Sequence, residues 1–208
     1  MKKSYLIFLF LLVFCSKPKQ TINKEELTKE LDSILLVDQK YRTQWKTIHD
    51  KFGPDSQEMK DLWAKQQTVD SSNLQRIIKI IEEVGGYPGK SLVGYSASET
   101  TFFVLQHAPD SIQEKYYELI LEAGKNDELE NRLVVMYQDR YLMHRGEPQI
   151  FGTQIRSEKK INPVTNVKFD SMYLWPIADT TRIDSVRMWN GLGPLEQYLN
   201  NFGLSRWK

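Results

Sequence analysis

Between residues 24 and 84, apolar side chains recur at steps of three and four residues, the spacing that aligns them on one face of an α-helix. The first stretch carries Leu27, Leu31, Ile34, Leu35, Tyr41, Trp45 and Ile48 on this face. The second stretch carries Leu62, Trp63, Leu74, Ile77 and Ile81. The pattern therefore predicts two long amphipathic helices at the start of the folded body.

Capping signals divide the rest of the chain. Capping-box spacing occurs at Asn23 with Glu26, Asp55 with Glu58, Ser96 with Glu99, and Ser111 with Glu114. Stop signals occur at Gly53-Pro54, at residues 85–89, at Gly124 and at Gly146. Together they predict helices over 24–50, 56–84, 97–108, 110–123, 127–145, 183–190 and 194–202.

Between the predicted helix over 127–145 and the one over 183–190 lie three short segments, 149–155, 164–169 and 172–177. They are rich in β-forming residues and bounded by turn residues. We therefore expect a mainly α (α+β) fold: a multi-helix bundle with a small antiparallel β-sheet near the C-terminal third. The body of 23–208 is predicted to form a single domain.

Residues 1–15 have the pattern of a secretory signal. Lys2 and Lys3 precede an apolar run over 6–14, which is too short to span a bilayer and ends at Cys15. Leu12, three positions before this cysteine, resembles the pattern of bacterial lipoprotein signals, in which the cysteine carries acyl chains. The polar residues 16–22 are typical of a flexible tether.

We therefore expect an exported protein, anchored through lipid on Cys15 to the periplasmic or cell-surface side of a bacterial membrane. Phe14 departs from the lipoprotein pattern, because a small residue is usual at that position. An ordinary cleaved and secreted soluble protein is the alternative.

Charge and cysteine content limit the partners of the chain. The 28 basic and 27 acidic residues become 26 and 27 when Lys2 and Lys3 leave with the leader. Such balance argues against a nucleic-acid partner, which needs a basic face. A single cysteine allows no internal disulfide, and three histidines are too few for a convincing zinc site, so we expect no metal and no cofactor.

Charged and polar residues interrupt the apolar helical faces. Asp38 lies on the first face, with Arg42 one turn further along, and Asp70 and Asn73 lie together on the second face. A charge that faces a core is costly unless it is paired and hydrogen-bonded. These residues are therefore either a buried structural ion pair or part of a binding site.

Further polar candidates follow. Gln106 and His107 end the third predicted helix, and of Asp139 and Arg140 in the fifth, one must turn inward. A lone histidine at such a position is more often a structural residue, although the titration range of His107 suits acid–base chemistry. Gln149 and Gln154 flank Gly152, and strand alternation places their side chains on opposite faces unless a bulge intervenes.

This ordered set resembles a family of bacterial proteins known only as domain of unknown function 6624. The resemblance rests on Asp38-Gln39-x-x-Arg42, Asp70-x-x-Asn73, Gly86-Tyr87-Pro88, Gln106-His107, Asp139-Arg140, the segment Gly146 to Gln154, and Arg187 before Gly191-Leu192. It spans about residues 30–200. Tyr87 and Phe151 stand where the family more often has Trp and Tyr. The family implies no activity.

Two functional hypotheses follow, with a structural alternative. In the first, the chain is an extracytoplasmic hydrolase or group-transfer enzyme, with His107 as general acid or base, oriented by Asp38 or Asp139. Arg42, Arg140 and Arg187 would hold an anionic substrate. Asp70, Asn73, Gln106, Gln149 and Gln154 would complete the ligand site.

In the second hypothesis, the chain is a non-catalytic envelope lipoprotein that binds a small polar ligand or a protein partner. The structural alternative makes the same polar residues a network that fixes helix packing. The sequence does not indicate the oligomeric state.

Overall fold

The computed structural model describes residues 22–206, so the predicted leader, Cys15 and nearly all of the predicted tether lie outside the described residues. The helices are α1 (Lys24–Arg42), α2 (Trp45–Phe52), α3 (Gln57–Val84), α4 (Lys90–Val93), α5 (Tyr95–Leu105), α6 (Asp110–Lys115), α7 (Tyr117–Lys125), α8 (Asn131–His144), α9 (Ile183–Trp189) and α10 (Leu195–Asn200). The strands are β1 (Ile155–Ile161) and β2 (Lys168–Leu174). The predicted fold class is confirmed.

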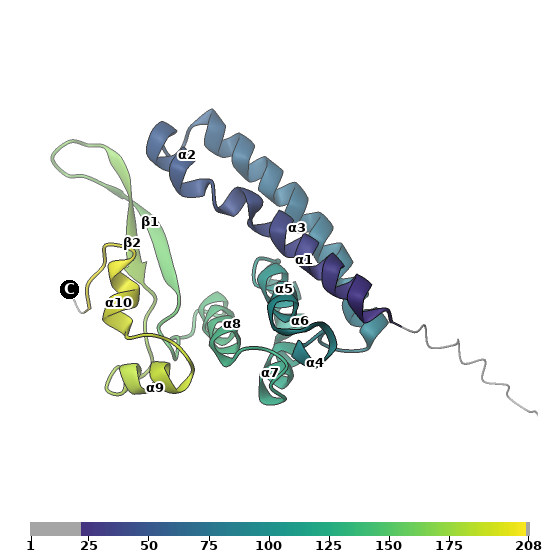
Figure 1. The fold of residues 1–208 in the computed structure, drawn as a ribbon. Helices are drawn as coiled ribbons and strands as arrows, with labels where there is room; N and C mark the ends of the chain where they lie inside the picture. Colours follow the sequence, from purple (N-terminus) through teal and green to yellow (C-terminus); the bar gives the residue numbers. More distant parts are fainter. Residues whose placement is uncertain (1–21, 207–208) are drawn as a thin grey trace, which may run out of the picture.

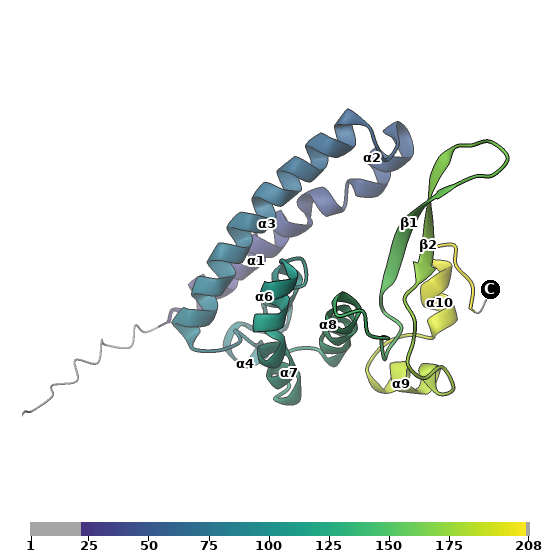
Figure 2. The same ribbon diagram turned by 180° about the vertical axis from the view of Figure 1, so that it is seen from behind.

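The two long helices α1 and α3 lie side by side and antiparallel, with α2 at the turn between them (Figures 1 and 2). The prediction of one helix over 24–50 is wrong, because a turn at Thr43 and Gln44 interrupts the helix. The Thr43 hydroxyl and the Gln44 side-chain amide both donate to the carbonyl of Lys40, at 3.2 and 2.9 Å. Such local bonds compete with the helical ladder.

Only some predicted caps are used. Asn23 caps α1 by accepting from Glu25 N and Glu26 N. The prediction for Asp55 is wrong, since Ser56 caps α3 by accepting from Met59 N at 3.2 Å. Ser96 and Ser111 lie within α5 and α6 instead of before them.

Gly53, Gly85 and Gly146 follow helix ends with positive φ, as expected of stop signals. Gly124 does not end a helix but lies inside α7, where a side chain would collide with Val134 of α8. It allows two helices to approach closely.

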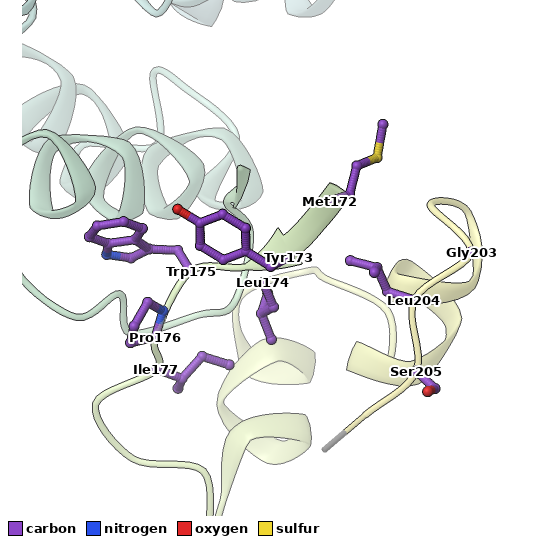
Figure 3. Close-up of a pocket in the computed structure, with 9 residues that line it drawn as sticks. All are labelled: Met172, Tyr173, Leu174, Trp175, Pro176, Ile177, Gly203, Leu204 and Ser205. Carbon is purple, nitrogen blue, oxygen red and sulfur yellow. The ribbon is translucent and has the colours of Figure 1, made fainter. Parts of the chain in front are cut away.

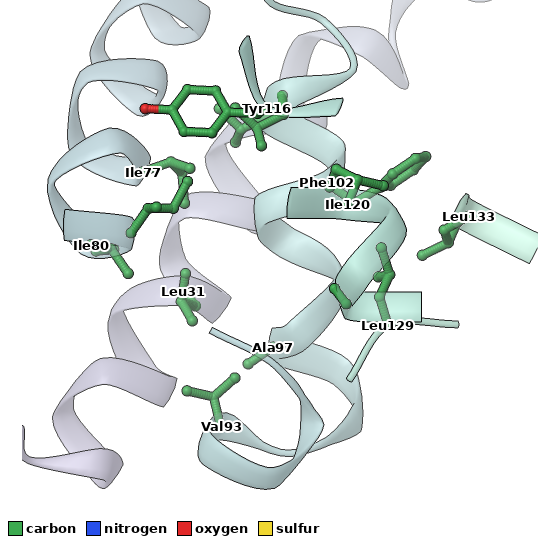
Figure 4. Packing of buried hydrophobic residues seen from close by; sticks show 14 of the residues in the cluster. Leu31, Ile77, Ile80, Val93, Ala97, Phe102, Tyr116, Ile120, Leu129 and Leu133 are labelled. Carbon is green, nitrogen blue, oxygen red and sulfur yellow. The ribbon is translucent and has the colours of Figure 1, made fainter. Parts of the chain in front are cut away.

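The main core lies where α1, α3, α4, α5, α7 and α8 meet (Figure 4). Leu31, Ile77, Phe102 and Ile120 are fully buried in it. Burying each such side chain contributes about 1.5–3 kcal/mol relative to exposure. Of the predicted apolar faces, Leu27, Leu31 and Ile34 on α1 meet Ile77 and Ile81 on α3 in this core.

The C-terminal part has a smaller core of its own, built on Ile183, Leu195 and Leu199, with Leu174 and Ile177 packed against it. Its sheet is a hairpin in which β1 pairs antiparallel with β2, from Ile155 opposite Leu174 to Ile161 opposite Lys168. The predicted antiparallel sheet is present, but the predicted strand bounds are shifted. The Asn162 side chain accepts from Val164 N and Thr165 N and so makes the turn where a strand over 164–169 was expected.

No helix in residues 22–206 combines the length and the hydropathy needed to cross a membrane.

Candidate functional site

Asp38 is buried on the inner face of α1, with 1% of its side chain exposed. Its Oδ2 accepts from Arg42 Nε at 3.3 Å and from Gln39 Nε2 at 2.8 Å, so the predicted pairing with Arg42 is confirmed. Burial raises the pKa of Asp38, although the charge of Arg42 acts in the opposite direction. The protein therefore holds this carboxylate at an energetic cost.

Arg42 also links α1 to α3. Its Nη2 donates to Asp70 Oδ1 at 2.5 Å, and Asp70 is held from its own helix by Gln66 Nε2 at 2.7 Å. Gln66 also donates to the carbonyl of Asp38. Gln66 is not among the residues predicted from the sequence, although its position one turn before Asp70 on the same helical face indicates it.

His107 follows α5 and points toward the same carboxylate. Its Nδ1 lies 3.9 Å from Asp38 Oδ2 and has no hydrogen-bond partner of ordinary geometry. Burial, together with the nearby charges of Arg42 and Arg140, lowers the pKa of His107 to about 3, while the carbonyl of Phe103 acts in the opposite direction. The imidazole is therefore neutral at physiological pH.

Arg140 approaches this group from α8. Its Nη1 donates to the carbonyl of Gln106 at 3.0 Å and its Nε to Gln154 Oε1 at 3.2 Å. Both acceptors are neutral, and no carboxylate of residues 22–206 lies within ion-pair distance of its guanidinium. Burial lowers the pKa of Arg140, and repulsion by Arg42 acts in the same direction.

These residues form one group, which we call the polar site: Asp38, Arg42, Asp70, Gln106, His107, Arg140 and Gln154. A recess of about 270 Å³ adjoins it, lined by Gln67, Asp70, Ser71, Leu74, Val104, His107, Ala108 and Pro109. Asp70 and His107 belong to both the polar site and the recess wall. Side chains from distant parts of the sequence therefore meet beside an open space.

Other candidates lie outside the polar site or are used by the fold. Asn73 is buried and donates to the carbonyl of Ile34 at 3.4 Å, which ties α3 to α1. Asp139 is fully buried, as one of the pair Asp139-Arg140 was expected to be.

Asp139 holds the segment that follows α8. Its carboxylate accepts from Ile150 N at 2.7 Å, Phe151 N at 3.0 Å, Thr153 N at 3.0 Å and Thr153 Oγ1 at 2.9 Å. Burial raises the pKa of Asp139, while these donors lower it. Asp38, not Asp139, is thus the carboxylate that the fold places beside His107.

Arg187 holds the other side of the same segment. It is 2% exposed and donates to the carbonyls of Phe151, Gly152 and Gly193 at 2.7, 3.0 and 2.7 Å. Its guanidinium is thus committed to backbone oxygens and is not placed to contact a ligand.

The side chain of Gln149 bonds to the backbone of Gln154. Gln154 N donates to Gln149 Oε1 at 2.8 Å, and Gln149 Nε2 donates to the carbonyl of Gln154 at 3.1 Å. The strand expected over 149–155 begins only at Ile155, so strand alternation does not apply to 149–154, which is a turn held by Asp139 with Gly152 at a φ of 66°. The side chain of Gln154 still reaches Arg140.

Another recess is more voluminous, at about 400 Å³, but has different chemistry (Figure 3). It lies between the end of β2 and the C-terminal segment and is lined by Met172, Tyr173, Leu174, Trp175, Pro176, Ile177, Gly203, Leu204 and Ser205. None of these residues is charged, so this recess offers no anchor for an anion. Nor does the described part of the chain gather three or more His, Cys, Asp or Glu side chains as a metal site.

The protein is mainly helical, and its polar site adjoins a recess whose wall includes Asp70 and His107. The chain belongs to the family of unknown function DUF6624, whose model matches residues 25–204. The resemblance seen in the sequence is thereby confirmed. Comparisons with curated proteins and with solved structures find no match.

Proposed function

We propose that the polar site binds a small anionic molecule. The observation that carries this proposal is the state of Arg140, a largely buried cation whose protein acceptors are the Gln106 carbonyl and the Gln154 amide oxygen. Arg42 is satisfied by two carboxylates, whereas Arg140 is near Arg42 and is repelled by it. An anion held by Arg140 would relieve this repulsion.

Thermal unfolding of the full chain tests the proposal, with inorganic phosphate, citrate and glucose 6-phosphate as probes and glucose as the uncharged control. A bound anion at 100 times its dissociation constant stabilises the native state by about 2.7 kcal/mol. We expect at least one anion to raise the melting temperature, and Arg140→Gln to abolish that rise.

Arg145→Gln is the matched control, because Arg145 is an exposed arginine just after α8 that pairs with Glu147 and Glu114. It should leave the anion effect intact. The proposal fails if no anion stabilises the protein, or if Arg140→Gln is stabilised as strongly as the parent. That outcome would favour a polar network that only fixes helix packing.

A second candidate function is hydrolysis or group transfer on the bound anion. It is favoured by the unbonded Nδ1 of His107, which borders the recess and lies beside Asp38. A neutral imidazole accepts a proton from an attacking water, and a bound anion would raise its low pKa toward the working range. Arg42 and Arg140 would then stabilise negative charge that develops on the substrate.

Replacing His107 by Gln separates catalysis from binding. If the site is catalytic, His107→Gln keeps the anion-induced thermal shift but loses turnover of p-nitrophenyl phosphate or p-nitrophenyl acetate. Turnover that is unchanged in this variant would remove His107 from the mechanism.

The sequence also supports export and lipid anchoring on Cys15 as part of the proposal. In bacterial cells that express the full chain, we expect the protein in the membrane fraction. Cys15→Ser should move it out of that fraction after detergent-free washing. A parent protein that is already in the soluble extracytoplasmic fraction would favour the secreted alternative.

A further inference from the structure

A further recess, of about 370 Å³, lies at the α2 end of the α1–α3 pair, between the α2–α3 turn and the β1–β2 hairpin. One wall carries the rings of Trp45 and His49 from α2 and of Trp63 from α3. The facing wall carries Lys159 from β1 and Asp170 from β2. None of these residues belongs to the polar site.

The aromatic wall continues the apolar faces of the helices beyond the core. Trp45 and Trp63 lie on the faces that the sequence predicted to be buried, yet neither belongs to a buried cluster, and Trp63 is 41% exposed. Trp45 stacks on His49 with ring centroids 4.8 Å apart. Buried Met59, one turn before Trp63, lies below this surface. Large exposed apolar surface of this kind commonly marks a binding site.

The hairpin covers this surface without filling the space. Its closest polar link to the helices is an ion pair of Lys159 Nζ with Asp55 Oδ1 at 3.4 Å, between two well-exposed side chains. Such a pair contributes at most about 1 kcal/mol. The volume of the recess falls within the usual range for small-molecule sites, about 300–1,000 Å³.

The rim indicates the kind of ligand. Lys159 lies between Asp55 and Asp170, at 3.4 and 3.9 Å, so one cation is shared by two carboxylates. An anionic ligand would therefore find no free positive charge here, and a cationic ligand would have to compete with Lys159 for both carboxylates. Ser157, Lys159 and the two carboxylates together offer both donors and acceptors at the edge of an apolar floor.

We propose that this recess binds an uncharged saccharide. A pyranose ring has an apolar face of C–H groups, which packs on an indole ring, and an edge of hydroxyls, which both donate and accept hydrogen bonds. The two tryptophans would hold the ring face, and the rim residues would bond its hydroxyls. This inference is independent of anion binding at the polar site, because the two sites share no residue.

Isothermal titration and tryptophan fluorescence of the full chain test it, with chitotriose, cellotriose and maltotriose as probes. Sorbitol is the control solute, since it has the hydroxyls of a sugar but no ring. We expect saturable binding of at least one trisaccharide and none of sorbitol. Trp63→Ala should weaken that binding about tenfold or more, since a lost ring contact costs about 1.4 kcal/mol.

Trp189→Ala is the matched control, because Trp189 on α9 is also exposed, at 76%, and does not line this recess. It should leave binding unchanged, and Trp63→Phe should retain part of it. Melting curves of each variant show that the fold is kept. The proposal is overturned if no trisaccharide binds, if sorbitol or tetramethylammonium binds in their place, or if Trp63→Ala binds as tightly as Trp189→Ala.

Discussion

His107 is the residue at which burial and charge act most strongly together. Its imidazole lies beside Asp38 yet receives the repulsion of two arginines, and its pKa falls to about 3. The ordinary pKa of a histidine in an unfolded chain is about 6.5. Between these two values the unfolded chain binds a proton that the folded chain does not.

This difference predicts the pH dependence of stability. As the pH falls from about 6.5 toward 3, the free energy of unfolding should decrease, because protonation favours the unfolded chain. At pH 5 the loss from His107 should be about 2 kcal/mol, from 1.36 kcal/mol per pH unit. Denaturant unfolding of the parent and of His107→Gln, at pH 7.5 and pH 5, measures it as the difference between the two proteins.

Other groups with shifted pKa values must cancel in that comparison, His144 and Asp38 among them. The pKa of His144 is also lowered, by burial, and the pKa of Asp38 is raised, so Asp38 acts with the opposite sign as the pH falls. Neither shift is caused by His107, so both remain in the variant. Equal acid sensitivity of the parent and His107→Gln would show that His107 titrates normally.

The buried carboxylate of Asp139 is a second group whose contribution to stability can be measured by a single substitution. Its carboxylate accepts from three backbone amides and one hydroxyl while fully buried. Asp139→Asn replaces one acceptor oxygen by an NH₂ group that faces donors, so we expect a loss of about 2–4 kcal/mol in the free energy of unfolding. Urea denaturation measures it, with exposed Asp32→Asn on α1 as a control that should change stability by less than about 0.5 kcal/mol.

At the scale of elements, the segment 149–154 depends on Gly152. Its φ of 66° lies in the left-handed region, and an added Cβ would lie 3.0 Å from Ile177 Cδ1 and 3.1 Å from Leu195 Cδ1. Gly203 has the same φ of 66° but no atom within 4 Å of an added Cβ. Comparing alanine substitutions at these two glycines therefore separates the cost of backbone strain from the cost of steric crowding.

We expect Gly203→Ala to cost about 1 kcal/mol, from φ alone, and Gly152→Ala to cost about 2–3 kcal/mol, from φ and contact together. Thermal unfolding of both variants measures the difference. Equal losses would mean that Ile177 and Leu195 move aside at no cost.

Local patterns predicted the helices well, because apolar periodicity and caps such as Asn23 act within a few residues. They predicted the burial of Asp38 and its pairing with Arg42 for the same reason. The break at Thr43 was missed because side-chain bonds to one carbonyl leave no trace in the apolar spacing. The strand bounds were predicted wrongly because they depend on the contacts of Asp139 with residues 150–153 and on the turn made by Asn162. Strand alternation does not encode either.

At the scale of the whole molecule, the segment 149–154 lies between two separate cores and contacts elements of both. The helical core ends at α8, whose Asp139 holds residues 150–153 from one side. Arg187 of α9 holds Phe151 and Gly152 from the other side, and Tyr198 of α10 donates to the carbonyl of Thr153 at 2.5 Å. The segment therefore connects two cores that share no apolar residue.

This arrangement predicts that the smaller core opens first when the Arg187 contacts are lost. In Arg187→Gln, three carbonyls lose their charged donor, and we expect faster amide hydrogen exchange over 150–156 and in α9 and α10. Exchange in α1, α3 and α5 should stay close to that of the parent, because their contacts belong to the other core. Arg182→Gln, an exposed change next to α9, is the control and should alter neither region. If exchange in Arg187→Gln rises equally in all helices, the two cores unfold as a single cooperative unit, and the joining segment has no separate role.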